Sequence, residues 1–133
     1  MKKIVFDSFA MIAFFEKETG AEIVAEHLYA LIQKKQSGFM SVINWGEIYY
    51  NILREQGEKS AEKILDQMQK YPIEIIGADK SLTYEAAKLK GKFKIAYADC
   101  FAAALARTLQ APLLTGDPEF KKLTGLIKIQ WIS

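Results

Sequence analysis

The stretch Ile4-Val5-Phe6-Asp7-Ser8 decides the fold. Its three consecutive apolar residues, which follow two lysines, are typical of a strand buried on both faces of a parallel sheet. Asp7 and Ser8 come directly after that strand and are good residues for starting a helix. We therefore expect an apolar helix over residues 9–15, so that a strand leads straight into a helix, as in a β–α–β unit.

The rest of the chain repeats this alternation. Further strands are predicted over residues 38–42, 73–76, 112–115 and 127–132, and further helices over residues 21–32, 44–54, 60–70, 79–90 and 99–109. Gly57 and Gly91 are expected to end helices. Strands that alternate with helices of this length favour parallel pairing with right-handed crossovers. We expect one domain over residues 1–133, an α/β fold built as a three-layer α/β/α sandwich with a mostly parallel sheet of four to five strands.

Composition excludes several classes of function. Half of the 133 residues are hydrophobic, which is enough for one core, and the net charge of +2 is too small for a strongly basic nucleic-acid binder. Cys100 is the only cysteine, so neither an intramolecular disulfide nor a zinc site with paired thiolates is possible. His27 is the only histidine, and a serine–histidine–aspartate triad would depend on it.

The sequence predicts a cytoplasmic location. No run of about 20 apolar residues could cross a membrane. The first apolar stretch is interrupted by Asp7 and is not followed by a small-residue cleavage site, so no secretory signal is expected.

Four acidic residues stand at positions where a parallel sheet binds ligands. Asp7 follows the first strand and Asp117 follows the predicted strand over residues 112–115, both at the carboxyl ends of strands. Glu47 interrupts an apolar, aromatic stretch, and Asp99 begins an alanine-rich helix that can lie close to its neighbours. Each has an ordinary alternative as well, because Asp7 and Asp99 could simply cap helices and Asp117 could simply form a turn.

Several carboxylates in one place repel each other unless a cation compensates them. Mg²⁺ and Mn²⁺ prefer oxygen ligands, lower the pKa of a bound water and stabilise charge on a phosphodiester. The four acids therefore indicate a catalytic site that holds one or two Mg²⁺ or Mn²⁺ ions.

The same segments resemble a known family, the PIN-domain proteins, and within it the VapC-type toxin ribonucleases. The resemblance rests on four short motifs in family order, which are VFDS at residues 5–8, NWGEIYY at 44–50, ADCFAAALA at 98–106 and LTGDPEF at 114–120. Each motif is unspecific alone, but the ordered set covers nearly the whole chain.

The resemblance implies a function and a set of site residues. Asp7, Glu47, Asp99 and Asp117 match the family's metal-binding acids, while Ser8 and Thr115 match its supporting hydroxyl positions. Asn44 lies one helical turn before Glu47 and is expected to orient it. The family cuts RNA, its toxins are inhibited by a cognate antitoxin, and homodimers are common. We thus expect an endoribonuclease toxin that hydrolyses phosphodiester bonds with metal-activated water.

Lysines and aromatic residues give further expectations. Lys88, Lys90, Lys92 and Lys94 form a basic stripe before Asp99, which is either an RNA-binding rim or a solvated helix end. His27 and Cys100 are expected to be structural. Eight side chains exceed what two short helices need for one core, so some should form a groove for a partner helix. They are Phe9, Ile12, Phe14, Phe15, Tyr49, Tyr50, Ile52 and Leu53.

Two alternative functions remain open at this point. A flap-endonuclease-like DNA nuclease uses the same arrangement of acids, usually in a longer chain with more of them. A non-catalytic PIN-like interaction module would be expected to lack one of the acids, and none of them is missing here.

Overall fold

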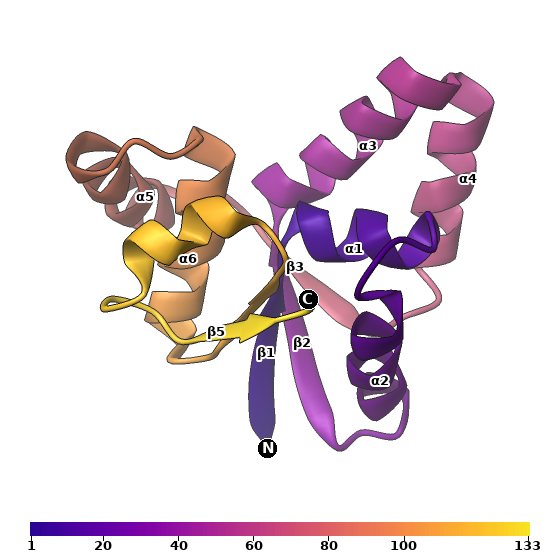
Figure 1. The fold of residues 1–133 in the computed structure, drawn as a ribbon, viewed down its shortest axis with the longest axis horizontal. Coiled ribbons are helices and arrows are strands. Elements are labelled where there is room, and N and C mark those ends of the chain that lie inside the picture. Colours follow the sequence, from indigo (N-terminus) through magenta and orange to yellow (C-terminus); the bar gives the residue numbers. More distant parts are fainter.

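The computed structural model describes all 133 residues, and it confirms the predicted α/β/α sandwich (Figure 1). Five parallel strands lie in the order β3-β2-β1-β4-β5. The strands are β1 (Lys2–Phe6), β2 (Gln36–Ser41), β3 (Ile73–Ile76), β4 (Leu113–Thr115) and β5 (Ile129–Trp131). The helices are α1 (Ser8–Phe15), α2 (Ala21–Ile32), α3 (Val42–Gln56), α4 (Glu58–Met68), α5 (Lys80–Lys92) and α6 (Tyr97–Leu109), with a 3₁₀ helix η1 (Pro118–Leu123).

The central strand β1 supplies both faces of the sheet with core residues. Val5 packs with α5, α6 and η1 on one face, whereas Ile4 and Phe6 pack with α1 and α2 on the other. Figure 1 shows the same division, with α5 and α6 on one side of the sheet and α1, α2 and α4 on the opposite side. The continuous apolar run predicted this burial on both faces.

Two predicted boundaries are wrong by one or two residues. The strand predicted over residues 38–42 is β2 at Gln36–Ser41, and the next helix already begins at Val42, because the Ser41 hydroxyl accepts a hydrogen bond from the Ile43 N–H (3.2 Å) and caps it. Gly91 does not end α5, which continues to Lys92. Glycine lowers helix stability only modestly, so it is tolerated within the last turn of a helix.

The start of α6 matters most for the site. The helix begins at Tyr97, two residues before the predicted start, and Ala96 is its N-cap. Asp99 therefore lies in the first turn and does not cap the helix, which leaves its carboxylate free for another role. By contrast, Asp7 does cap α1, and its side chain accepts the Ala10 N–H.

Candidate metal centre

The four predicted acids all belong to the carboxyl edge of the sheet or to helices that begin there. Asp7 follows β1 and Asp117 follows β4, and these strands are direct neighbours with Phe6 paired to Leu114. Glu47 lies in the second turn of α3, which follows β2, and Asp99 lies in the first turn of α6. Strand order thus brings together acids that are up to 110 residues apart in sequence.

Asp7 is the most deeply buried of the four, with only 1% of its surface exposed. Its Oδ1 accepts the Ala10 N–H at 2.8 Å, and its Oδ2 accepts the Thr115 hydroxyl at 2.5 Å. Burial raises its pKa to about 8, although both hydrogen bonds act in the opposite direction, and the nearby charges of Asp99 and Asp117 raise it further. Without a cation, Asp7 is therefore mostly protonated at neutral pH.

Thr115 ties β1 to the loop after β4. Its hydroxyl donates to Asp7 and accepts the Asp117 N–H at 3.1 Å. This residue is fully buried, so the hydroxyl has no competing water contacts. Asp117 itself caps η1, because its Oδ1 accepts the Glu119 N–H at 2.9 Å.

Glu47 is positioned by two donors from different helices. The Ser8 hydroxyl donates to Glu47 Oε1 at 2.8 Å, and the Asn44 amide donates to the same oxygen at 3.0 Å. Neither donor contacts Oε2 of Glu47, so that oxygen stays available to a ligand.

Asn44 connects α3 to α6 in the interior of the protein. Its amide nitrogen also donates to the Ala98 carbonyl at 3.2 Å, next to Asp99, and its side chain is fully buried. Its Oδ1 has no hydrogen-bond partner. A buried amide oxygen without a partner is costly, and a ligand-bound water at the adjacent site would satisfy it.

The pKa of Asp99 is raised by burial and also by the other carboxylates near it. Its side chain accepts no hydrogen bond from the protein, and burial raises its pKa to about 7, with further contributions from Asp117, Glu47 and Glu119. These carboxylates therefore lie within electrostatic reach of one another. The structure brings all four predicted acids into one electrostatic neighbourhood, as expected from the sequence.

Glu119 is an acid that the sequence argument did not select. It lies in η1, pairs with Lys122 (2.6 Å), and contributes to the raised pKa of Asp99. Its place two residues after Asp117, behind Pro118, was a possible signal, but the 3₁₀ helix that directs it toward the site was not predicted.

A divalent cation suits the chemistry of these donors. Five carboxylates, two hydroxyls and a buried amide supply oxygen ligands and their hydrogen-bond support, the set that Mg²⁺ and Mn²⁺ prefer. No three acidic, histidine or cysteine side chains are placed to hold an ion directly in this structure. The hydrogen bonds to Asp7 and Glu47 fix the positions of two of these carboxylates.

The lysine stripe separates into structural and free residues. Lys90 donates to the Ile95 carbonyl at 2.8 Å and so fixes the connection between α5 and α6. Lys88 pairs with Glu85 (2.9 Å). Lys92 and Lys94 are exposed and form no ion pair.

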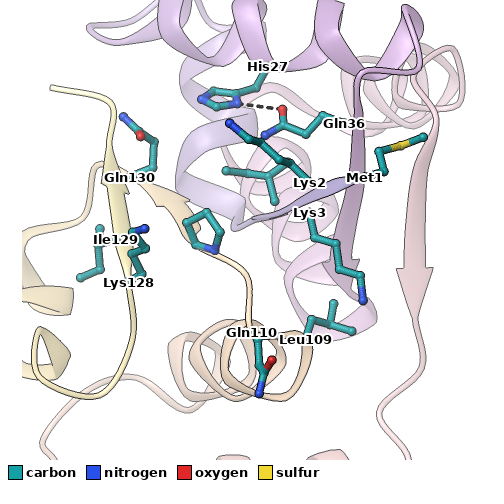
Figure 2. Close-up of a pocket in the computed structure, with 12 residues that line it drawn as sticks. Met1, Lys2, Lys3, His27, Gln36, Leu109, Gln110, Lys128, Ile129 and Gln130 are labelled. Carbon is teal, nitrogen blue, oxygen red and sulfur yellow. Dashed lines mark hydrogen bonds between the residues drawn. The ribbon is translucent and has the colours of Figure 1, made fainter.

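A hollow lies at the amino edge of the sheet, opposite to the acids (Figure 2). It measures about 640 Å³ and contains none of the acids described above. His27 lies there and forms a hydrogen bond with Gln36 (3.0 Å), so the structure gives it a structural contact remote from the acids. Adjacent Lys2 and Lys3 extend in different directions in Figure 2 and do not converge on one point.

The eight side chains from which a partner groove was expected to be built do not share one location. Phe14 and Phe15 line a hollow of about 530 Å³ together with Tyr71. Ile52 is buried in the core and so belongs to no groove. Phe9 remains 41% exposed but does not line this hollow. The remaining four are Ile12, Tyr49, Tyr50 and Leu53, of which Tyr50 and Leu53 are exposed. Cys100 is fully buried in the core, as expected for a packing residue.

A parallel α/β sandwich with acids at the carboxyl ends of its central strands defines the class of this protein. The chain belongs to the PIN domain family, whose model matches residues 4–126. No curated protein sequence matches it significantly. No helix meets the length and apolarity needed to span a membrane.

Solved structures share the fold across their whole length. VapBC2 from Rickettsia felis, bound to a promoter DNA fragment, is similar with a TM-score of 0.75 and 20% identity, covering 97% of this chain and 98% of that chain. DNA-bound VapBC from Salmonella typhimurium has a TM-score of 0.75 and 14% identity, with full coverage of both chains. VapC20 from Mycobacterium tuberculosis, a sarcin-ricin loop cleaving toxin, has a TM-score of 0.72 and 14% identity, covering 96% of this chain and 98% of that chain.

Proposed function

We propose that this chain is a Mg²⁺- or Mn²⁺-dependent endoribonuclease and the toxin of a toxin–antitoxin pair. The observation that carries the proposal is the set of acids from β1, α3, α6 and the loop after β4. Two of them, Asp7 and Asp99, have pKa values raised to about 8 and 7. Membership of the PIN family and the shared fold with VapC20, a sarcin-ricin loop cleaving toxin, support the same interpretation.

Asp7, Asp99, Asp117 and Glu47 would hold the one or two ions. A bound ion would lower the pKa of a coordinated water and offset the charge that develops on the scissile phosphate. The protein's own contribution is to keep the acids in place. Asp7 is held by two hydrogen bonds and Glu47 by two more, so little reorganisation of these carboxylates accompanies the reaction.

Hydrolysis by water predicts one type of product. Attack by water on the phosphorus that breaks the P–O3′ bond expels the 3′-oxygen, which takes up a proton, and leaves a 5′-phosphate and a 3′-hydroxyl. Attack by the neighbouring 2′-hydroxyl breaks the P–O5′ bond instead and leaves a 2′,3′-cyclic phosphate and a 5′-hydroxyl. The end groups of the fragments therefore test the mechanism independently of the RNA target.

Lys92 and Lys94 are proposed to contact RNA phosphates. Both are exposed and free of ion pairs, and the residue 93–96 connection leads directly into the helix that carries Asp99. Replacing both with alanine should weaken RNA binding and flatten its salt dependence, because fewer counterions are released. Lys90, which was also predicted to bind RNA, has its ammonium group on the Ile95 carbonyl, so we expect a smaller salt effect from its replacement.

An antitoxin is the proposed protein partner, as in the VapBC complexes that share this fold. The hollow lined by Phe14, Phe15 and Tyr71 lies where α1, α2 and α4 meet. Its aromatic and alanine residues lie beside polar ones, a lining that suits an amphipathic helix. The polar residues are Lys17, Glu22, Gln67 and Lys70. A homodimer and a cytoplasmic location are expected as well. Light scattering of the purified protein measures the first of these.

The test is cleavage of labelled total RNA by the purified protein in Mg²⁺, Mn²⁺ or EDTA. Asp99→Asn should abolish cutting, because it removes a ligand, whereas Asp66→Asn, an exposed acid on α4, should leave it unchanged. Both variants must unfold with the same cooperativity as the wild type. Cutting in EDTA, or equal cutting by Asp99→Asn, would contradict the proposal.

A highly selective enzyme could fail to cut when its RNA is absent from the preparation. Thermal unfolding with and without Mn²⁺ then decides, because an ion that binds only the native state raises its stability. No shift at millimolar Mn²⁺ would favour a non-catalytic interaction module.

A further inference from the structure

An exposed aromatic ring lies beside the acids. Phe9 is the second residue of α1, two residues after Asp7, and 41% of its surface is exposed. Its ring packs on the loop that carries Asp117, because a Cβ atom on Gly116 would lie only 2.5 Å from Phe9 Cε1. The ring therefore borders the loop after β4, directly beside the residue that precedes Asp117.

Close packing around Gly116 holds the Phe9 ring in place. The same Cβ position on Gly116 is 2.9 Å from the Ile132 side chain, so glycine is needed for the ring and Ile132 to approach the loop this closely. Any other residue at position 116 would push the ring away. The result is a supported ring with a large exposed fraction next to the acids.

Neither the core nor the apolar hollow explains this exposure. Phe9 belongs to neither of the two core clusters. It also does not line the hollow formed by Phe14, Phe15 and Tyr71, which is the surface suited to a partner helix. An exposed phenylalanine costs hydrophobic free energy unless a ligand covers it. Because the Phe9 ring packs on the loop that carries Asp117, a ligand bound by the acids is well placed to cover the ring.

We propose that Phe9 stacks on a nucleobase of the RNA strand whose phosphate lies at the acids, and so selects an unpaired nucleotide. Bases in a duplex are already stacked on both faces, whereas single-stranded loops can place a base on an aromatic side chain. The inference rests on the proposed function and adds to it a residue that positions the base beside the scissile bond. Stacking tolerates any of the four bases, so sequence preference comes from elsewhere.

The test compares two small ligands that differ only in the base. Adenosine 5′-monophosphate and ribose 5-phosphate carry the same sugar and phosphate, and their dissociation constants are measured by NMR titration with Mn²⁺ replaced by diamagnetic Mg²⁺. The wild type should bind the nucleotide about tenfold more tightly, which is the size of one base–aromatic stack. Phe9→Ala should lose this preference and keep its affinity for ribose 5-phosphate, and Phe9→Trp should retain the preference.

Tyr29→Ala is the matched control, because it removes an aromatic ring that is 62% exposed on α2. It should leave both affinities unchanged. A wild type without preference for the nucleotide would overturn the proposal, and so would a Phe9→Ala variant that keeps the preference, in which case the ring is left to a protein partner. An equal loss for both ligands would also overturn it, since it would show that Phe9 only shapes the phosphate site.

The two proposals can fail separately. A base preference that depends on Phe9, in a protein that cuts no RNA in any metal, would retain the stacking site and remove the nuclease. Metal-dependent cutting that proceeds unchanged in Phe9→Ala, with no base preference, would do the reverse.

Discussion

Replacing Asp7 with asparagine should stabilise the metal-free protein. Asp7 is 1% exposed and its pKa is raised from 3.8 to about 8, mainly by burial. The folded protein keeps this proton at pH values where the unfolded chain has released it, so stability falls as pH rises from about 4 to about 8. Each pH unit in this window costs about 1.4 kcal/mol, which amounts to roughly 5 kcal/mol at pH 7.5.

Asparagine avoids this cost because it is neutral at every pH. It caps a helix about as well as aspartate and can still accept the Ala10 N–H. Its amide replaces the acceptor of the Thr115 hydroxyl with a donor, which costs about 1–3 kcal/mol. We therefore expect Asp7→Asn to raise the free energy of unfolding by about 2–4 kcal/mol at pH 7.5 in EDTA.

Urea denaturation at pH 5 and pH 7.5 measures this effect. The gain from Asp7→Asn should be larger at pH 7.5, because only the wild type loses stability through Asp7 over that interval, whereas the loss through Asp99 is common to both proteins. Asp79→Asn is the matched control, since Asp79 caps α5 with the same 2.8 Å bond to the N–H three residues later but is exposed. It should change stability by less than about 0.5 kcal/mol. A loss of stability in Asp7→Asn at pH 7.5 would refute the reasoning.

Three further predictions follow from particular residues. The urea midpoint of the metal-free wild type should fall between pH 4 and pH 7, because Asp7 and Asp99 both hold protons in the native state that the unfolded chain has released; a rising midpoint would contradict this. Gly116→Ala should destabilise the protein by about 1–3 kcal/mol, because the added methyl group overpacks the contact with Phe9 and Ile132. Gly91→Ala, in open space on α5, should instead stabilise the protein by up to about 1 kcal/mol, because alanine favours the helix. Thermal unfolding of the two variants compares these effects. Lys90→Met should lower the unfolding temperature in calorimetry, since it removes the bond that fixes the α5–α6 connection, and an unchanged melt would argue against that role.

The sequence predicts the sheet well because its signals are local. An apolar run followed by a helix cap identifies β1, and the parallel sheet then requires Asp7 and Asp117 to meet at one edge, since β1 and β4 are neighbours. Alternation of strands and helices gives the layers. These features depend on the periodicity of apolar residues, which one sequence shows, and on the general rule that crossovers are right-handed.

The parts that could not be predicted depend on tertiary contacts. Ser41 ends a strand and caps a helix at the same residue, so its neighbour Val42 was predicted as strand although it is helical. The hydrogen bond from Asn44 to the Ala98 carbonyl and the effect of Glu119 on Asp99 depend on α6 and η1 coming close in space. The exposure of Phe9 also depends on Gly116 and Ile132, which lie far away in sequence.

The central claim is that these acids bind a divalent cation, and calorimetric titration with Mn²⁺ tests it most directly. At pH 6.5 the wild type should bind Mn²⁺ with release of protons, because Asp7 and Asp99 are largely protonated beforehand and must ionise to serve as ligands. Running the titration in two buffers of different ionisation enthalpy counts those protons. Asp99→Asn should lose the binding, and Asp66→Asn should keep it. No binding by the wild type at millimolar Mn²⁺, or unchanged binding by Asp99→Asn, would contradict the account.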